Sequence, residues 1–388
     1  MRCAFMTIPL YQARRLSGSR LPRYSRREMA DPTAPTLEDL GWNEAFAAAF
    51  VPYAKQGMVP GRVVRESRGV YGVATADGDL PAAASGRLWH GEESEGAPAV
   101  GDWVAVRRPT LPEEPGLIRA ILPRKSKFSR KAAGSRTDEQ VVAANVDTVF
   151  LMTGLDQDFS PRRIERYLTA AWESGATPVV VLNKADLDDA LQDHVLEVER
   201  LALGVSVHAI SAATGDGVET LASYCGPGRT VSVLGSSGVG KSTLINRLLG
   251  RDAQRTGAVR TSDDTGRHTT THRELFLLPG GGLILDTPGM RELQLWEAED
   301  GLGTAFADIE ELASVCRFGN CGHAGEPGCA VEAAVADGTL AAGRLESWRK
   351  LQKELEHTRT RQDALARLRE KQKVKALHKA IRRFPPRG

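Results

Sequence analysis

The chain contains 388 residues, of which 41% are apolar and 26% charged, proportions typical of a globular protein. This length exceeds one ordinary hydrophobic core, so we expect roughly two to four domains. No apolar run approaches the roughly 18 residues that a membrane-spanning helix requires, which argues against a membrane protein. Five cysteines, three of them between residues 316 and 329, do not suit a secreted disulfide framework. They favour a metal site in a reducing cytoplasm.

The net charge of +2 conceals an uneven distribution along the chain. Residues 343–388 contain 15 Lys or Arg against 5 Asp or Glu, a local charge of +10, so the rest of the chain carries −8. Residues 1–27 contain seven Arg and no acid, as a targeting presequence does, but they lack the apolar core of a signal peptide. We therefore expect residues 1–35 to be a disordered basic extension or a misassigned start, with translation beginning at Met29.

A helix followed by a small barrel is predicted next. Apolar residues at helical spacing from Leu37 to Tyr53 indicate a lead-in helix within residues 36–58. Residues 59–127 then hold five short strand-like runs separated by Gly, Pro and Asp, which favours a β-barrel such as an OB-fold. These runs are residues 63–64, 70–74, 86–89, 102–106 and 117–122. The grooved face of such a barrel commonly receives RNA, but a purely structural barrel fits this segment equally well.

A basic connector follows, containing Lys125, Lys127, Arg130, Lys131 and Arg136. It could contact phosphates or be a solvated loop.

Residues 128–298 alternate apolar runs with amphipathic segments. The expected strands are residues 147–153, 178–182, 206–210, 230–234 and 282–285, and the expected helices are residues 161–173, 191–203 and 244–249. This alternation predicts an α/β domain with a parallel, doubly wound sheet. Its ligands are expected at the carboxyl ends of the strands.

A phosphate-binding loop lies between a predicted strand and a predicted helix, with the spacing Gly-x4-Gly-Lys-Ser. Its glycines let backbone amides turn toward a diphosphate, Lys241 can neutralise the β- and γ-phosphates, and Ser242 can bind Mg2+. We expect nucleotide contacts from Gly235, Ser236, Ser237, Gly238, Val239, Gly240, Lys241, Ser242 and Thr243.

A second motif at a strand end indicates which base is bound. A buried Asp186 carboxylate can accept hydrogen bonds from N1–H and the 2-amino group of guanine, Asn183 can meet O6 and N7, and the stem of Lys184 can cover the ring. Adenine lacks these two donors and would leave the carboxylate unpaired. Ser211 and Ala212 are expected to close the pocket with a backbone amide to O6. The predicted ligands are therefore GTP and GDP.

Two switch elements follow the phosphate loop. Among the threonines after His268, we choose Thr270 as the residue whose hydroxyl completes the Mg2+ shell. Asp286 can hold the metal through water, and the Gly289 amide can sense the γ-phosphate. Met290 stands where many GTPases have a water-orienting Gln, which predicts slow intrinsic hydrolysis with His268 or a partner as the substitute.

The order of these motifs is circularly permuted, because the base motif precedes the phosphate loop. As a result, the Asp286 switch leads within some thirty residues into a cysteine-rich segment. That segment provides three thiols and one imidazole, the ligand set of a closed structural zinc site, in Cys316, Cys321, His323 and Cys329. Residues 331–337 and 340–382 then have a helix-favouring sequence that includes the basic tail. The basic residues of this tail could bind RNA phosphates or form a solvated helix face.

Together, the permuted motifs, the OB-like barrel and the Cys-x4-Cys-x-His-x5-Cys cluster resemble the bacterial family of ribosome small subunit-dependent GTPase A, over about residues 59–365. The resemblance implies a cytoplasmic GTPase that acts late in assembly of the 30S subunit. It further implies contact with 16S rRNA through the barrel and zinc domain, hydrolysis of GTP on the subunit followed by release, and a catalytic role for His268. We expect a monomer without DNA or membrane partners, organised as a barrel (59–127), a GTPase domain (128–298) and a helical zinc-binding domain with a basic tail (299–388). Two rival hypotheses are a signalling or transport GTPase without an RNA partner and a passive RNA-binding module.

Overall fold

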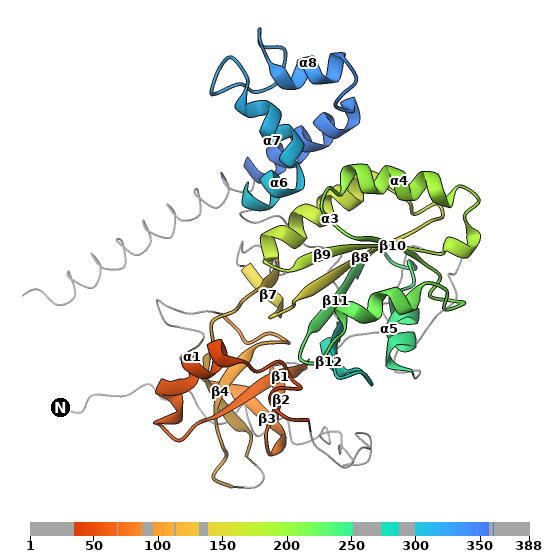
Figure 1. Ribbon diagram of the computed structural model, residues 1–388. Helices are drawn as coiled ribbons and strands as arrows, with labels where there is room; N and C mark the ends of the chain where they lie inside the picture. Colours follow the sequence, from red (N-terminus) through yellow and green to blue (C-terminus); the bar gives the residue numbers. More distant parts are fainter. Residues whose placement is uncertain are drawn as a thin grey trace, which may run out of the picture. The chain divides into compact units, whose positions relative to one another are not determined.

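The computed structural model describes residues 35–67, 69–86, 88, 96–111, 114–131, 139–250, 273–286, 299–356 and 360. Figure 1 shows a barrel, an α/β sheet and a group of C-terminal helices along this part of the chain. This is the architecture expected from the sequence. Within these ranges, none of the helices combines the length and apolar character needed to cross a membrane.

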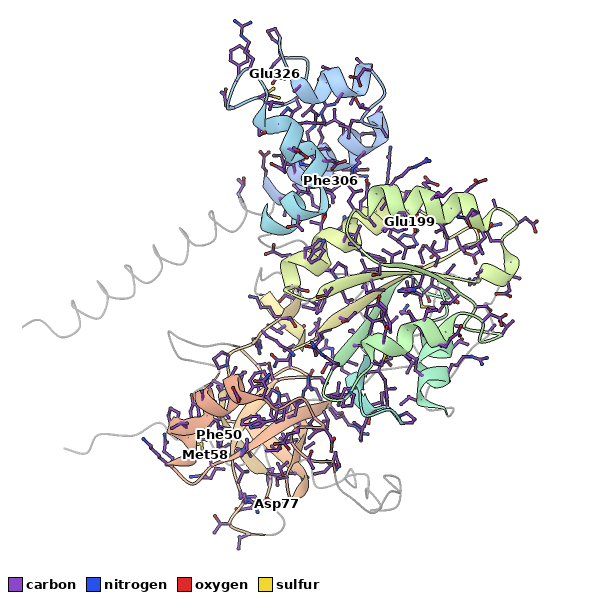
Figure 2. The ribbon with its side chains drawn as sticks, in the orientation of Figure 1. Phe50, Met58, Asp77, Glu199, Phe306 and Glu326 are labelled. Carbon is purple, nitrogen blue, oxygen red and sulfur yellow. The ribbon has the colours of Figure 1, made fainter. Side chains whose placement is uncertain are left out.

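The lead-in helix α1 (Glu44–Ala54) begins later than expected, because Asn43 caps it. The Asn43 side chain accepts a hydrogen bond from the Phe46 amide at 3.1 Å, which satisfies one of the unpaired donors of the first turn. Phe46 and Phe50 are buried, and the Phe46 ring lies 5.8 Å from that of Trp103 in the barrel. These aromatic contacts fix the helix against the barrel. Phe50 is labelled in Figure 2.

The barrel has the strand order of an OB-fold. Its strands are β1 (Val59–Ser67), β2 (Val70–Thr75), β3 (Gly78–Ala84), β4 (Trp103–Arg107) and β5 (Gly116–Ile121). They pair in the order β1-β2-β3-β5-β4, with β3 parallel to β5, and β4 returns to β1 to close the barrel.

The strand predicted at residues 86–89 is wrong. The third strand is β3, because Thr75 pairs directly with Gly78 and so folds β3 back onto β2 in a tight hairpin. Gly78 has φ 107°, a conformation that glycine adopts readily. Residues 86 and 88 are turn and helix, and residues 87 and 89 lie outside the described part of the chain.

Of the two alternatives for the basic connector, phosphate contact or a solvated loop, the loop is wrong for residues 127–131. β6 (Lys127–Lys131) pairs with β7 (Glu139–Ala144) in a separate two-stranded antiparallel sheet. Lys125 forms an ion pair with Asp147 at 2.6 Å. Arg136 lies outside the described residues.

The α/β sheet runs in the order β10-β9-β8-β11-β13-β12. All neighbours from β10 to β13 are parallel, and β12 is antiparallel to β13. β12 was not anticipated from the sequence, and it also pairs with β1, so the sheet continues into the barrel. The strands are β8 (Thr148–Gly154), β9 (Thr177–Asn183), β10 (Val207–Ile210), β11 (Thr230–Gly235), β12 (Arg273–Leu277) and β13 (Leu283–Asp286).

Helices cover both faces of this sheet (Figure 1). Val149 and Leu151 of β8 pack in one core with α3 and α4, and the alternate residues Phe150 and Met152 pack in a second core with α5. Burial on both faces explains why β8 has an unbroken apolar sequence. The helices are α3 (Pro161–Ser174), α4 (Leu191–Leu201) and α5 (Lys241–Leu249), with 3-10 turns η3 (Ala185–Leu187) and η4 (Val218–Tyr224).

The C-terminal helices form a third core. They are α6 (Glu299–Ala305), α7 (Ala307–Ser314), α8 (Ala330–Ala336) and helical backbone at residues 342–356. Phe306, labelled in Figure 2, is fully buried, and the Arg344 guanidinium lies 4.7 Å from the centre of its ring. The rest of the tail helix predicted to residue 382, apart from residue 360, falls outside the described ranges.

Candidate functional site

The predicted motifs meet at one edge of the sheet because the strands that carry them are parallel. β9 ends at Asn183, β10 at Ile210, β11 at Gly235 and β13 at Asp286. Ligands bind at this edge in open α/β sheets. His268, Thr270, Gly289 and Met290 lie outside the described residues.

The phosphate loop needs glycine at two positions because neighbouring atoms approach its backbone closely. A Cβ at Gly235 would lie 2.3 Å from the Met152 carbonyl oxygen, and one at Gly240 would lie 2.3 Å from Asn183 Nδ2. Gly240 also has φ 102° and caps the N-terminus of α5. Bare backbone at the start of a helix is a ready anion site, so the loop can bind phosphate groups.

Lys241 lies across this loop. Its Nζ donates to the carbonyl oxygens of Gly235 at 2.9 Å and Ser236 at 2.5 Å. Ser242 and Thr243 follow in the first turn of α5 and are partly exposed. The Lys241 ammonium, the two hydroxyls and the N-terminus of α5 therefore lie together at this loop.

Asn183 connects the base motif to the phosphate loop. Its Nδ2 donates to the Val239 carbonyl at 2.7 Å, and its Oδ1 accepts from the Ala212 amide at 2.8 Å. We had expected these groups to meet guanine directly. The Ala212 amide instead has an acceptor within the protein, and Asn183 has at most one Nδ2 hydrogen left for a purine.

The three other residues predicted at the base site, Asp186, Lys184 and Ser211, differ in their exposure to solvent. Asp186, in η3, is exposed, whereas we had expected a buried carboxylate. Lys184 has φ 68° and pairs through Nζ with Asp156 Oδ2 at 2.5 Å. Ser211 is 1% exposed, and its Oγ accepts from the Thr214 amide at 3.2 Å to close the turn beyond β10.

Sequence reasoning missed three residues at this edge. Arg247 of α5 donates from Nε to the Ala212 carbonyl at 2.9 Å and from Nη2 to the Ala213 carbonyl at 2.6 Å. Asp156 and Asp158 lie between β8 and α3 and contact Lys184 and Ser236, respectively. Asp156 and Asp158 could have been predicted as site residues, because they follow directly after a buried strand of a parallel sheet.

The pKa of Asp156 reflects these contacts. Partial burial by itself raises it, but the hydrogen bond from Lys184, the Asp158 amide and the Lys184 charge together bring the pKa below its ordinary value. Asp156 is therefore a carboxylate at neutral pH and forms a true ion pair with Lys184.

The four predicted metal ligands converge in the C-terminal region. Their donor atoms all lie within 4.8 Å of one another. His323 Nδ1 is 3.6 Å from Cys316 Sγ and 3.4 Å from Cys329 Sγ, and the two sulfurs are 4.0 Å apart. A tetrahedral zinc ion would separate such atoms by about 3.6–3.8 Å, so Cys316, Cys321, His323 and Cys329 fit this metal.

The surroundings of the cluster suit thiolate ligands. The Ala330 amide donates to Cys316 Sγ at 3.3 Å and the Glu332 amide to Cys329 Sγ at 3.4 Å, which supports negative charge on sulfur. Glu326, labelled in Figure 2, accepts from the amides of Gly322 at 2.9 Å and Ala324 at 2.6 Å and so shapes the ligand loop.

The chain is similar to a set of known proteins that share one description. A family model described as RsgA GTPase matches residues 121–296. The chain is 49% identical to "Small ribosomal subunit biogenesis GTPase RsgA" of Opitutus terrae over 89% of this chain and 97% of that protein. It is 43% identical to the protein of the same name from Syntrophotalea carbinolica, over 90% of this chain and 97% of that protein.

Solved structures show the same fold. The crystal structure of YjeQ from Thermotoga maritima matches with a TM-score of 0.57 and 28% identity, over 77% of this chain and 98% of that one. YloQ, described as a circularly permuted GTPase, matches with a TM-score of 0.54 and 25% identity, over 77% of this chain and 96% of that one. The convergent nucleotide motifs, the cysteine–histidine cluster and this similarity place the chain in the RsgA GTPase family, as a GTPase with a circularly permuted nucleotide-binding domain.

Proposed function

We propose that this GTPase acts late in assembly of the 30S ribosomal subunit, hydrolyses GTP when it is bound to the subunit, and then leaves. The observation that carries the proposal is the similarity over 89% of the chain to a protein named for small-subunit biogenesis. The convergence of phosphate loop and base motif supports a working nucleotide site rather than a passive RNA-binding module.

Guanine selection is assigned to Asp186. Its exposed carboxylate stands beyond β9, where it can accept from the two donors that guanine has and adenine lacks. Lys241 and the phosphate-loop amides bind the phosphates. Mg2+ would be held by Ser242 and Thr270 directly and by Asp286 through water, and it would supply positive charge to the bound phosphates.

Hydrolysis is assigned to His268 because Met290 lacks the group that orients water in many GTPases. Basal turnover should therefore be slow. Binding to the subunit would bring His268 toward the γ-phosphate, and loss of that phosphate would weaken the complex and release the protein.

The partner surface is assigned to the barrel, the metal-binding domain and the basic tail, which would contact 16S rRNA. Residues 343–388 carry a charge of +10, the electrostatic property that rRNA phosphates require. The four-ligand cluster would hold one zinc ion with a structural role, since four protein ligands leave no open position. The protein is expected to work as a cytoplasmic monomer without DNA.

The test is GTP turnover measured with and without purified 30S subunits at low salt. We expect subunits to accelerate hydrolysis by several powers of ten, on the order of what external groups supply to other GTPases. His268→Ala should retain nucleotide and subunit binding but lose the stimulated turnover. Association should weaken steeply with added salt as cations are released from rRNA phosphates.

Two results would contradict the proposal. Equal stimulated rates for wild type and His268→Ala on saturating subunits would remove the histidine from catalysis. Absence of any stimulation at low salt would favour a signalling GTPase without a ribosomal partner.

A further inference from the structure

We propose that residues 155–160, between β8 and α3, form a two-carboxylate clamp in which Asp156 positions Lys184 at the base motif and Asp158 positions the phosphate loop through Ser236. Both carboxylates are positioning residues, since neither would touch the reacting atoms. The clamp acts on guanine nucleotide binding by the protein alone, so it does not depend on the ribosomal role proposed above.

At the base motif, Asp156 restrains a lysine that would otherwise be flexible. The ion pair between Asp156 Oδ2 and Lys184 Nζ measures 2.5 Å, with 35% and 22% of the two side chains exposed. The Asp156 carboxylate and the Lys184 stem both lie close to Gly154, since a Cβ at that residue would lie 2.7 Å from Asp156 Oδ1 and 3.6 Å from Lys184 Cδ. Because the Lys184 ammonium is bonded to Asp156, the clamp would order this side chain before a base binds.

At the phosphate loop, Asp158 holds the residue that follows Gly235. Its Oδ2 accepts a hydrogen bond from Ser236 Oγ, and its Oδ1 pairs with Arg163 Nη1 at the start of α3. The Ser236 carbonyl in turn accepts from Lys241 Nζ at 2.5 Å. The carboxylate therefore constrains the part of the loop to which the phosphate-binding lysine is bonded.

The short loop makes these two contacts interdependent. The Leu155 amide donates to the Asn183 carbonyl at 2.8 Å, which ties the start of the loop to the end of β9. Asp156 then organises the rest, because its Oδ1 accepts from the Asp158 amide at 3.0 Å and its carbonyl accepts from the Phe159 amide at 2.9 Å. Moving one carboxylate must displace the other.

The charges of the clamp are balanced. Carboxylates beside a phosphate site would repel an anionic ligand, but Asp156 is paired with Lys184 and Asp158 with Arg163. Each pair adds no net charge, so the clamp can order both ends of the nucleotide site without weakening phosphate binding by repulsion. Loss of the clamp should mainly increase the rate at which bound nucleotide dissociates.

The test is the dissociation rate of fluorescent GDP from the full-length protein, measured by stopped flow without ribosomal subunits. Asp156→Asn removes the charge from one contact, and Ser236→Ala removes the hydroxyl from the other. Each should accelerate dissociation by about tenfold, the effect expected for a partly exposed hydrogen bond to a charged group. Asp189→Asn removes an exposed carboxylate just beyond the base motif, outside the clamp, and should leave the rate unchanged.

A double-mutant cycle distinguishes a positioning role from a general destabilisation of the fold. Asp158→Ala and Ser236→Ala should each accelerate dissociation, and the double variant should be no faster than either single variant. Asp156→Glu should restore part of the wild-type rate, with Tm unchanged throughout. Wild-type rates in Asp156→Asn and Ser236→Ala, or additive effects of Asp158→Ala and Ser236→Ala, would overturn the clamp while leaving the ribosomal proposal intact.

Discussion

Replacing Arg62 by Met should destabilise the junction between the barrel and the α/β sheet. Arg62 is a charged residue of β1 that is only 1% exposed. Its guanidinium donates to the Leu40 carbonyl, to the Asn145 carbonyl at 3.1 Å and to Thr230 Oγ1 at 2.8 Å. Burial lowers the pKa of Arg62 to about 10, against the opposing charges of Asp147 and Asp102, so the group is still a cation at neutral pH.

The expected decrease in the free energy of unfolding follows from the hydrogen-bond acceptors that the substitution leaves without Arg62. Arg62 also donates to the Gly101 carbonyl at 3.2 Å, but that oxygen keeps a second donor, Asn145 Nδ2, at 3.0 Å. The Leu40 carbonyl, the Asn145 carbonyl and Thr230 Oγ1 each lose Arg62 as a donor in a buried site, which costs about 1 kcal/mol for each acceptor. The packing cost is small because Met fills most of the vacated volume. We expect a loss of about 3 kcal/mol and a Tm lower by roughly 6–12 °C.

Thermal unfolding and hydrogen exchange measure this effect. Exchange should increase in the segments that Arg62 joins, around Leu40, Asn145 and Thr230, more than in the C-terminal helices. Arg108→Met is the matched control, because its ion pair with Asp77 is more than half exposed and should contribute less than about 1 kcal/mol. Equal Tm values for the two variants would refute the assignment of Arg62 as the residue that joins these segments.

Two further predictions concern the metal centre and the base motif. Metal analysis of protein purified without chelator should find one zinc atom per chain. Cys321→Ala should lose the zinc and unfold the C-terminal domain locally. Cys225→Ala is the control, because Cys225 lies in the α/β core, and this variant should retain the zinc. Finding no zinc in the wild-type protein would contradict the site. Asp186→Asn should bind GTP at least about tenfold more weakly and favour xanthine nucleotides, since an amide presents a donor to guanine's own donors. Undiminished GTP affinity would remove Asp186 from base recognition.

Local patterns were sufficient for the elements whose signals lie within a few residues. The Gly-x4-Gly-Lys-Ser spacing predicted the turn into α5, and the unbroken apolar run of β8 predicted a strand covered on both faces. The cysteine spacing predicted a cluster whose ligand atoms do converge. In these cases the residues that determine the structure lie close together in the chain, and few other structures would suit the same pattern.

The errors arose where pairing between strands decides the structure. β3 was placed too late because Pro81 and Asp79 make that strand resemble a loop, yet its register with β2 and β5 orders it. β12 has no distinctive pattern of its own and is defined by pairing with β13 and β1.

The motifs, their permuted order and the chemistry available to each residue type can be read directly from the chain. The partners that those residues meet depend on how distant segments pack together. Asn183 bonds to the phosphate loop 56 residues away, and Arg62 reaches Thr230 across 168 residues. Such contacts depend on sheet order and on the burial of both partners. No local pattern encodes them, because the same side chains placed in solvent would satisfy their hydrogen bonds with water.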